Sequence, residues 1–144
     1  MTLPDPHPRT RRFGAGERIL LVEDEEIVRQ HIHRMLVRLG YTVLDAVDGE
    51  AAIGILRHPD LQIDLALCDV IMPRMNGVSF WTHAQRVEPT LPFLFMSGFP
   101  PDTLHQDGYP RDVPILTKPF DELELSIRVR SAIEGRVRNS GLHP

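Results

Sequence analysis

The sequence predicts a doubly wound α/β fold in which helices cover both faces of a five-stranded parallel sheet. Short apolar runs of strand length alternate along the chain with segments whose apolar residues recur every three or four positions, as in an amphipathic helix. The first run, residues 18–22, is apolar without alternation, which is typical of a strand buried on both faces. Since parallel neighbours need crossover connections, this order places helices between successive strands.

The first half of the chain predicts two strand–helix pairs. Residues 18–22 form a strand that ends abruptly in acidic residues, and a helix begins at Glu25 with Gly40 as its C-terminal cap. Residues 41–46 form the second strand. The apolar face of a second helix runs from Ala51 to Leu56, and Pro59 ends it.

The second half continues the alternation with one irregularity. Strands are expected at residues 63–68, 92–96 and 113–116, a loop at 69–76, and helices at 78–87 and 121–138. Residues 99–112 contain Pro100, Pro101, Gly108 and Pro110, which leaves room for at most about two helical turns. We therefore expect a fourth helix that is short, broken or absent.

The last helix carries more apolar residues than one contact with the sheet requires. One apolar stripe packs on the sheet and the other is free for a partner or a second copy, so a monomer and a homodimer both fit. The two sets are Leu125, Val129, Ile133 and Val137, and Leu123 and Ile127.

Length and composition indicate one ordinary globular domain. The chain has 144 residues, of which 42% are apolar and 25% charged. We expect a flexible tail with prolines and arginines at 1–16, the domain at 17–139 and a C-terminal tail at 140–144. No apolar run reaches the roughly 18 residues of a membrane span, and the start lacks a secretory signal, so a cytoplasmic protein is expected. The net charge of −4 gives no general reason to expect nucleic acid.

Polar side chains stand where the predicted strands end. Glu23 and Asp24 follow the first strand, Asp69 the third, Ser97 the fourth and Lys118 the fifth. Ligand sites of open parallel sheets form beyond the carboxyl ends of the strands, so these groups should converge. Each has an ordinary alternative, with Asp24 capping a helix, Asp69 capping a loop and Lys118 in solvent, but their joint placement favours a site.

The convergent groups suit phosphoryl transfer. Three clustered carboxylates repel one another, and a hard divalent cation such as Mg²⁺, which prefers oxygen ligands, relieves that repulsion. The cation and Lys118 would neutralise charge as a phosphoryl group approaches Asp69, whose carboxylate is the nucleophile.

Four motifs together resemble the receiver domains of two-component response regulators. They lie between Arg18 and Arg138 and read Ile19-Leu20-Leu21-Val22-Glu23-Asp24-Glu25, Asp69-Val70-Ile71-Met72-Pro73-Arg74-Met75-Asn76-Gly77, Phe95-Met96-Ser97-Gly98 and Thr117-Lys118-Pro119-Phe120. The resemblance implies a flavodoxin-like topology with Asp69 as the phosphoacceptor.

The resemblance also implies a role for each remaining site residue. Asp24 and Asp69 would bind Mg²⁺ directly, Glu23 mainly through water, and the backbone carbonyl of Ile71 would be the third protein ligand. Ser97 matches the switch hydroxyl that moves to the phosphoryl oxygen. Lys118 matches the lysine that pairs with the phosphoryl group, and the Lys118–Pro119 bond would be cis.

One position departs from the family pattern. Three residues before Lys118, where receivers often have Tyr or Phe, this chain has Ile115. The usual coupling of the hydroxyl to an aromatic ring is therefore in doubt, and Phe99 is the candidate to replace it. The Ser97 region and the proline-rich loop resemble a subgroup of stand-alone receivers with a Phe-Ala-Thr-Gly-x-Tyr motif and a degenerate fourth helix, although receivers of hybrid kinases look similar.

The resemblance implies a signalling phosphoacceptor and not an enzyme that turns over a separate substrate. A sensor histidine kinase or a phosphotransfer protein would donate to Asp69, and a downstream protein would sense the change, with no DNA-binding domain. A relay shuttle and a detached receiver of a hybrid kinase are equally compatible with the residues. An aspartyl-nucleophile phosphatase would need a second Asp where Ile71 stands, and a flavin or nucleotide module would need a glycine-rich loop after the first strand.

Overall fold

The structure is a computed structural model that describes residues 14–72 and 75–142, with residues 136–142 described by their backbone only. Its five strands are β1 (Arg18–Val22), β2 (Thr42–Ala46), β3 (Leu65–Asp69), β4 (Phe93–Ser97) and β5 (Ile115–Thr117). They form one sheet in the order β2-β1-β3-β4-β5, and every neighbouring pair is parallel. The predicted five-stranded parallel sheet is confirmed.

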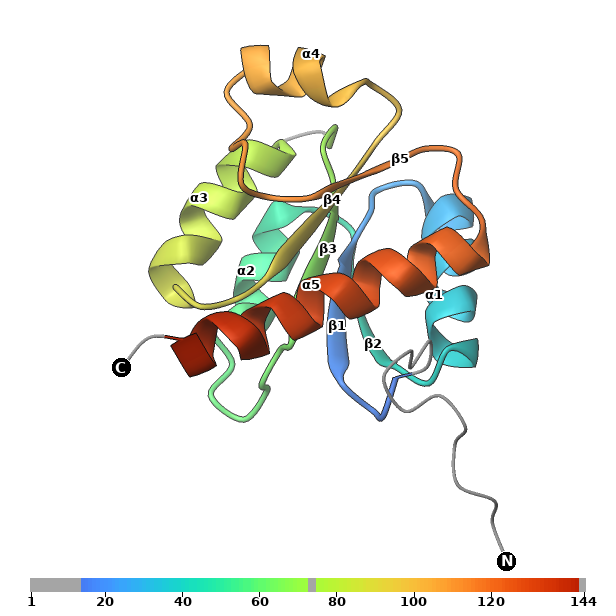
Figure 1. The fold of residues 1–144 in the computed structure, drawn as a ribbon, viewed down its shortest axis with the longest axis vertical. Helices are drawn as coiled ribbons and strands as arrows, with labels where there is room; N and C mark the ends of the chain where they lie inside the picture. The colour runs from blue at the N-terminus through green and yellow to red at the C-terminus, as the bar shows by residue number, and fades with distance from the viewer. Residues whose placement is uncertain (1–13, 73–74, 143–144) are drawn as a thin grey trace, which may run out of the picture.

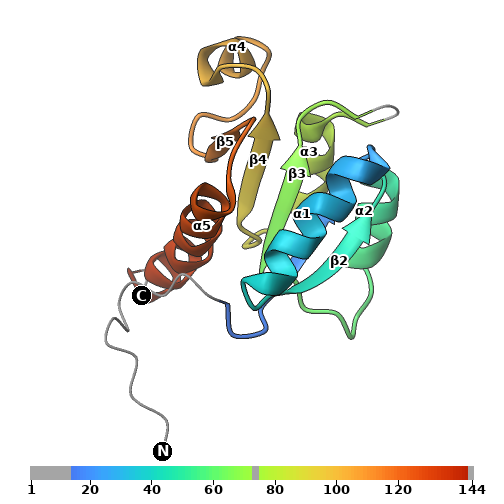
Figure 2. The same cartoon turned by 90° about the vertical axis from the view of Figure 1, so that its right-hand side faces the viewer.

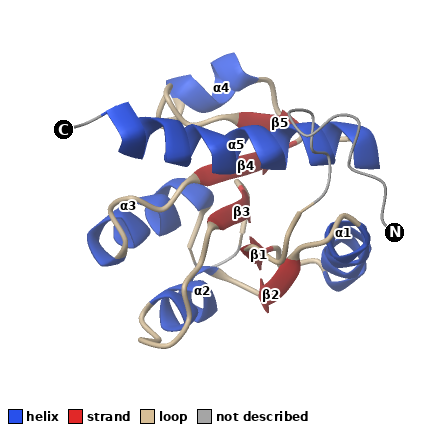
Figure 3. Cartoon of the chain, turned by 60° about the horizontal axis from the view of Figure 1, so that its bottom comes forward, coloured by secondary structure: helices blue, strands red, loops and turns tan. Residues whose placement is uncertain are grey.

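Helices cover both faces of the sheet (Figures 1 and 3). Residues of α1 (Glu26–Arg38) and α5 (Glu122–Leu142) pack on one face, and residues of α2 (Gly49–Leu56) and α3 (Gly77–Val87) pack on the other. Individual residues determine where some of these helices begin and end. Gly40 follows α1 with a φ of 96°, a conformation that glycine adopts without strain, and the Asn76 side chain accepts from the amide of Ser79 at the start of α3.

The fourth helix is short, as the sequence predicts. α4 (Pro101–Gln106) has six residues and lies beyond the tip of β4, at the carboxyl end of the sheet (Figure 2). Pro100 and Pro101 begin it, where a missing amide costs nothing, and Gly108 turns the chain back with a φ of 97°. Because α4 sits at the end of the sheet, it does not fill the layer between α3 and α5.

Several boundaries differ from the predicted ones by one to four residues. β3 includes Asp69, and β4 includes Ser97, so both polar groups belong to the last position of a strand. α5 runs to Leu142, four residues beyond the predicted end, and no proline interrupts the chain between Phe120 and His143.

Most of the predicted N-terminal tail, residues 1–13, lies outside the described residues. The amides of Gly14 and Gly16 donate to the carbonyls of Leu39 and Gly40 at the end of α1. Among the described residues, none of the helices combines the length and the apolar character that crossing a bilayer requires.

Candidate functional site

Three acidic side chains meet at the carboxyl end of the sheet. Glu23 and Asp24 follow β1, Asp69 ends β3, and these two strands are neighbours in the sheet. One carboxylate oxygen from each residue lies within 4.8 Å of the other two. Oxygen donors at this spacing suit a hard divalent cation.

Glu23 carries the carboxylate of this cluster that is most deeply buried. Its side chain is fully buried, and neither carboxylate oxygen has a hydrogen-bond partner among the described residues. Burial, and then the neighbouring Asp69, raise the pKa of Glu23 from its ordinary value of 4.5 to about 8. Without a cation, burial and the neighbouring Asp69 therefore favour the protonated form of Glu23.

Lys118 supplies positive charge beside the acidic cluster. Its Nζ lies 3.2 Å from Oδ2 of Asp69 and 3.8 Å from Oε2 of Glu23, and its side chain is 28% exposed. Its backbone amide donates to the carbonyl of Ser97 at 2.7 Å, and the Lys118–Pro119 bond is cis. The alternative that Lys118 lies in solvent is wrong.

The alternative that Asp24 caps the first helix is also wrong. The N-cap residue of α1 is Glu25, and its side chain makes no capping hydrogen bond. Asp24 is exposed and contributes to the acidic cluster.

The hydroxyl of Ser97 is engaged with the turn that follows β4. Ser97 is fully buried, and its Oγ donates to the carbonyl of Phe99 at 3.1 Å and accepts from the amide of Phe99 at 2.8 Å. The Phe99 side chain is 46% exposed. Ile115 is partly buried against the core that contains Phe93 and Phe95 of β4.

A hydrogen bond connects the loop after Asp69 to the Asp69 side chain. The amide of Ile71 donates to Oδ1 of Asp69 at 3.3 Å, while the Ile71 side chain is 59% exposed. Pro73 and Arg74, which belong to the sequence motif from Asp69 to Gly77, lie outside the described residues. Sequence reasoning missed one contact here, from Tyr109 to the carbonyl of Val70, because Tyr109 belongs to a proline-rich segment without periodicity.

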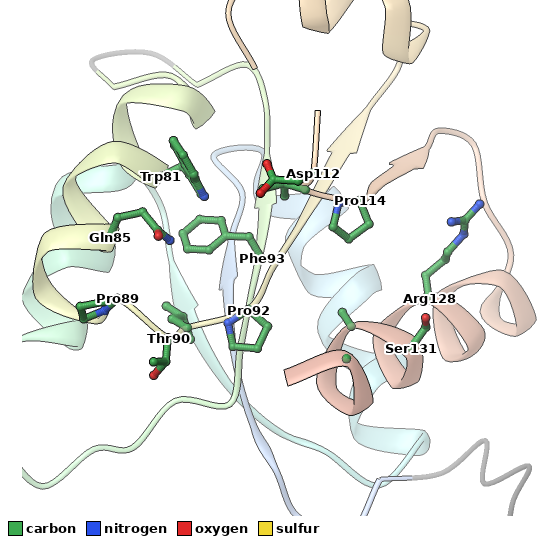
Figure 4. A pocket seen from close by; sticks show the side chains of 14 residues that line it. Trp81, Gln85, Pro89, Thr90, Pro92, Phe93, Asp112, Pro114, Arg128 and Ser131 are labelled. Atoms are coloured by element: carbon green, nitrogen blue, oxygen red, sulfur yellow. The ribbon is translucent and has the colours of Figure 1, made fainter. Parts of the chain in front are cut away.

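A cavity of about 660 Å³ lies at the other end of the sheet, between α3 and α5 (Figure 4). Trp81 and Gln85 of α3 line one side, and Arg128 and Ser131 of α5 line the other. Phe93, at the amino end of β4, also lines it. The cavity is therefore separate from the acidic cluster, which lies at the carboxyl ends of the strands.

Comparison with known families decides the class of this protein. Residues 19–130 match the family model of the response regulator receiver domain. The chain belongs to this family. The acidic cluster and the parallel sheet thus belong to a receiver domain of two-component signalling.

Individual relatives agree with this assignment. The chain is 34% identical to the response regulator receiver protein CpdR of Brucella abortus over 72% of this chain and 86% of CpdR. It is 33% identical to the sensor kinase CckA of Brucella abortus over 81% of this chain, but that match spans only 12% of the kinase. A solved receiver domain of a hybrid histidine kinase CckA superposes with a TM-score of 0.68 at 39% identity, covering 81% of this chain and 98% of that domain.

One similar structure holds a magnesium ion. It is the receiver domain of the sensor histidine kinase PA1611 of Pseudomonas aeruginosa, with magnesium coordinated in its active-site cleft. Its TM-score is 0.72 at 28% identity, over 83% of this chain and 99% of that domain.

Proposed function

We propose that this receiver is a phosphorylation switch in which Asp69 accepts a phosphoryl group from the phosphohistidine of a sensor histidine kinase or phosphotransfer protein. The observation that carries the proposal is the grouping of three carboxylates within 4.8 Å, with Lys118 3.2 Å from Asp69. Asp69 is the acceptor because it alone is both in the cluster and hydrogen-bonded to Lys118.

The transfer is a displacement at phosphorus. A carboxylate oxygen of Asp69 forms the new O–P bond as the N–P bond to the donor imidazole breaks, and the imidazole nitrogen keeps the electron pair and takes up a proton. Negative charge gathers on the equatorial oxygens during this step. Lys118, already beside Asp69, stabilises that charge from a fixed position, so little reorganisation is needed.

The residues present fit a magnesium ion. Glu23 has two buried carboxylate oxygens without a hydrogen-bond partner among the described residues, and a cation would compensate them. We assign Asp24, Asp69 and the backbone carbonyl of Ile71 as direct ligands, and Glu23 as a ligand acting mainly through water. When bound, the ion supplies positive charge that neutralises the carboxylates and the transferred group. The magnesium-bound PA1611 receiver supports the presence of a magnesium site in this cluster.

Ser97 is the proposed switch hydroxyl. In the present arrangement its Oγ is hydrogen-bonded to both backbone groups of Phe99. To donate to a phosphoryl oxygen on Asp69, the hydroxyl must release the Phe99 carbonyl. Phosphorylation would therefore alter the turn between β4 and α4, where Phe99 is half exposed, and a downstream protein would detect that change.

The relatives support two settings for the switch. The match to CpdR, which spans most of that protein, supports a single-domain response regulator whose output is protein contact. The match to the kinase CckA supports the second candidate, a phosphate-relay shuttle or the receiver of a hybrid kinase. The two differ in the fate of the phosphoryl group, which a shuttle hands on to another histidine.

Intact mass spectrometry tests the proposed chemistry. Wild-type protein incubated with acetyl phosphate and Mg²⁺ should gain one phosphoryl group, and neither Asp69→Asn nor wild type in EDTA should gain it. A metal-independent adduct, or one retained by Asp69→Asn, would overturn the assignment. Turnover of p-nitrophenyl phosphate by the wild type would instead favour the aspartyl phosphatase.

A further inference from the structure

Tyr109 reaches the acceptor loop from a part of the chain that the proposed chemistry does not use. It follows α4, is 8% exposed, and its phenol donates to the backbone carbonyl of Val70 at 2.6 Å. Val70 is the residue after Asp69, so the contact lies one peptide away from the phosphoacceptor. This hydrogen bond joins residues that are 39 positions apart in the sequence.

The tyrosine is held in place from several directions. Gly108 turns the chain with a φ of 97°, and the amide of Tyr109 donates to the carbonyl of Leu104 at the end of α4. Its ring packs edge-on against Phe95 of β4, with 5.2 Å between the ring centroids and 90° between the planes. A side chain at position 77 would lie 3.3 Å from the ring, so Gly77 leaves space for it.

Tyr109 completes the fixation of the Val70 peptide unit. The Val70 carbonyl accepts a second hydrogen bond from the amide of Gly77, at 3.0 Å, and the Val70 amide donates to Met96 of β4 at 3.1 Å. Burial raises the pKa of the Tyr109 phenol, which keeps it protonated and able to donate. With its amide and its carbonyl both hydrogen-bonded, Val70 anchors the chain immediately before Ile71.

We propose that Tyr109 is a positioning residue for the magnesium site, because its hydrogen bond to Val70 fixes the loop that presents the Ile71 carbonyl to the ion. This inference rests on the proposed function. Tyr109 touches neither the ion nor the phosphoryl group and acts through the Val70 peptide. Hydrogen-bonded groups that orient metal ligands commonly change metal affinity when they are removed.

The variant Tyr109→Phe removes the hydroxyl and keeps the ring. We expect its Kd for Mg²⁺, measured by isothermal titration calorimetry, to rise about tenfold, while phosphorylation by acetyl phosphate at saturating Mg²⁺ stays within about twofold of wild type. Tyr41→Phe is the matched control. Tyr41 is the only other tyrosine of the chain, is 4% exposed, and its hydroxyl lies 3.4 Å from Nη1 of Arg130, away from the acidic cluster.

The outcomes separate this inference from the proposed function. If wild type binds Mg²⁺ and Tyr109→Phe binds it with the same Kd, Tyr109 has no positioning role. An equal loss of affinity in Tyr41→Phe would also overturn that role, because it would reveal a general loss of stability. Failure of wild type itself to bind Mg²⁺ or to accept a phosphoryl group would overturn the proposed function.

A second measurement needs neither a variant nor phosphorylation. In NMR spectra of the wild type without Mg²⁺, the Tyr109 hydroxyl proton should exchange slowly with water, and its chemical shift should move as Mg²⁺ is added. The amide proton of Gly77, which shares the Val70 carbonyl, should shift over the same range of Mg²⁺ concentration. A rapidly exchanging hydroxyl, or signals that Mg²⁺ leaves unchanged, would overturn the inference.

Discussion

The two faces of the sheet are built from different kinds of side chain. The core between the sheet and helices α1 and α5, here called the aliphatic face, is almost entirely aliphatic. The core on the side of α2, α3 and α4, here called the aromatic face, contains three phenylalanines and Tyr109 in successive ring contacts. Those phenylalanines are Phe80, Phe93 and Phe95.

The two faces also differ in how completely their helices close over the sheet. On the aliphatic face, Arg38 of α1 and Glu122 of α5 form an ion pair at 2.7 Å. Beside the aromatic face, α4 has only six residues, and a cavity of about 660 Å³ remains between α3 and α5. The two helices of the aliphatic face are therefore joined by an ion pair, whereas the helix layer beside the aromatic face leaves a cavity at the amino ends of the strands.

The site residues divide between these faces. Side chains alternate along a strand, so Asp69 points to the same face as Leu65 and Leu67, which belong to the aliphatic core. Ser97 follows Phe93 and Phe95 and therefore points to the aromatic face. Asp69, the proposed acceptor, therefore points to the aliphatic core, whereas Ser97, the proposed switch hydroxyl, points to the aromatic face.

The largest expected effect on stability comes from a substitution in the aliphatic core. Leu125 of α5 is fully buried in the aliphatic core, and Leu125→Ala should lower the free energy of unfolding by about 3 kcal/mol. Leu123→Ala on the same helix, where Leu123 is 48% exposed, should change it by less than about 0.5 kcal/mol. Urea unfolding measures both. Equal effects of the two substitutions would contradict the burial of Leu125 in the aliphatic core and the exposure of Leu123 on the surface.

The next largest expected effect is on the rate of phosphorylation, and it concerns the positive charge of Lys118 beside Asp69. Lys118→Met keeps the length of the side chain and removes its charge, and should slow formation of the phosphoryl adduct by about a hundredfold at saturating Mg²⁺. Lys118 is the only lysine among the 16 lysine and arginine residues of the sequence. Amine-selective isotopic methylation therefore labels only Lys118 and the N-terminal amine, and an NMR spectrum of the labelled protein follows the Lys118 ammonium directly. A rate within threefold of wild type would remove Lys118 from the mechanism.

A smaller effect follows from the raised pKa of Glu23. Between pH 4.5 and about 8 the folded protein holds a proton on Glu23 that the unfolded chain has lost, because burial and Asp69 raise this pKa. Without Mg²⁺, the stabilisation from this proton is complete below pH 4.5 and is lost as pH rises through about 8. Since Mg²⁺ competes with the proton, its affinity should rise with pH by at most about tenfold per unit in this range.

Glu23→Gln tests this dependence. It should flatten the pH dependence of both urea unfolding and Mg²⁺ affinity between pH 5 and about 8, whereas Glu50→Gln, at an exposed position of α2, should leave both unchanged. If Glu23→Gln retains the wild-type dependence, another group holds the proton.

A small effect on stability is expected at Phe99, in the turn that follows β4. Phe99 is 46% exposed, so Phe99→Ala should change the free energy of unfolding by less than about 1 kcal/mol. We expect phosphorylation of the wild type to change Trp81 fluorescence, and Phe99→Ala to accept a phosphoryl group normally but to lose that change. Retention of the full fluorescence change would show that Phe99 does not take the part of the aromatic residue that Ile115 replaces.

Sequence reasoning located the acidic cluster because strand ends are a local property. A buried strand can be recognised from a few adjacent residues, and the carboxyl ends of neighbouring parallel strands must meet at one edge of the sheet. The grouping of Glu23, Asp24, Asp69 and Lys118 follows from those two facts. The short α4 was equally accessible, because Pro100 and Pro101 restrict the backbone wherever they occur.

By itself, the sequence determined the order of strands and helices and the chemical groups at the end of each strand, because periodicity and proline act over short distances. Only the tertiary structure decided that Glu23 is fully buried without a hydrogen-bond partner among the described residues, that the Ser97 hydroxyl turns to Phe99, and that Tyr109 reaches Val70. Glu23 is packed beside Asp69 and Lys118, which end or follow other strands, and Tyr109 is packed against Phe95 of β4. Such packing joins residues far apart in the chain, and no local pattern records it.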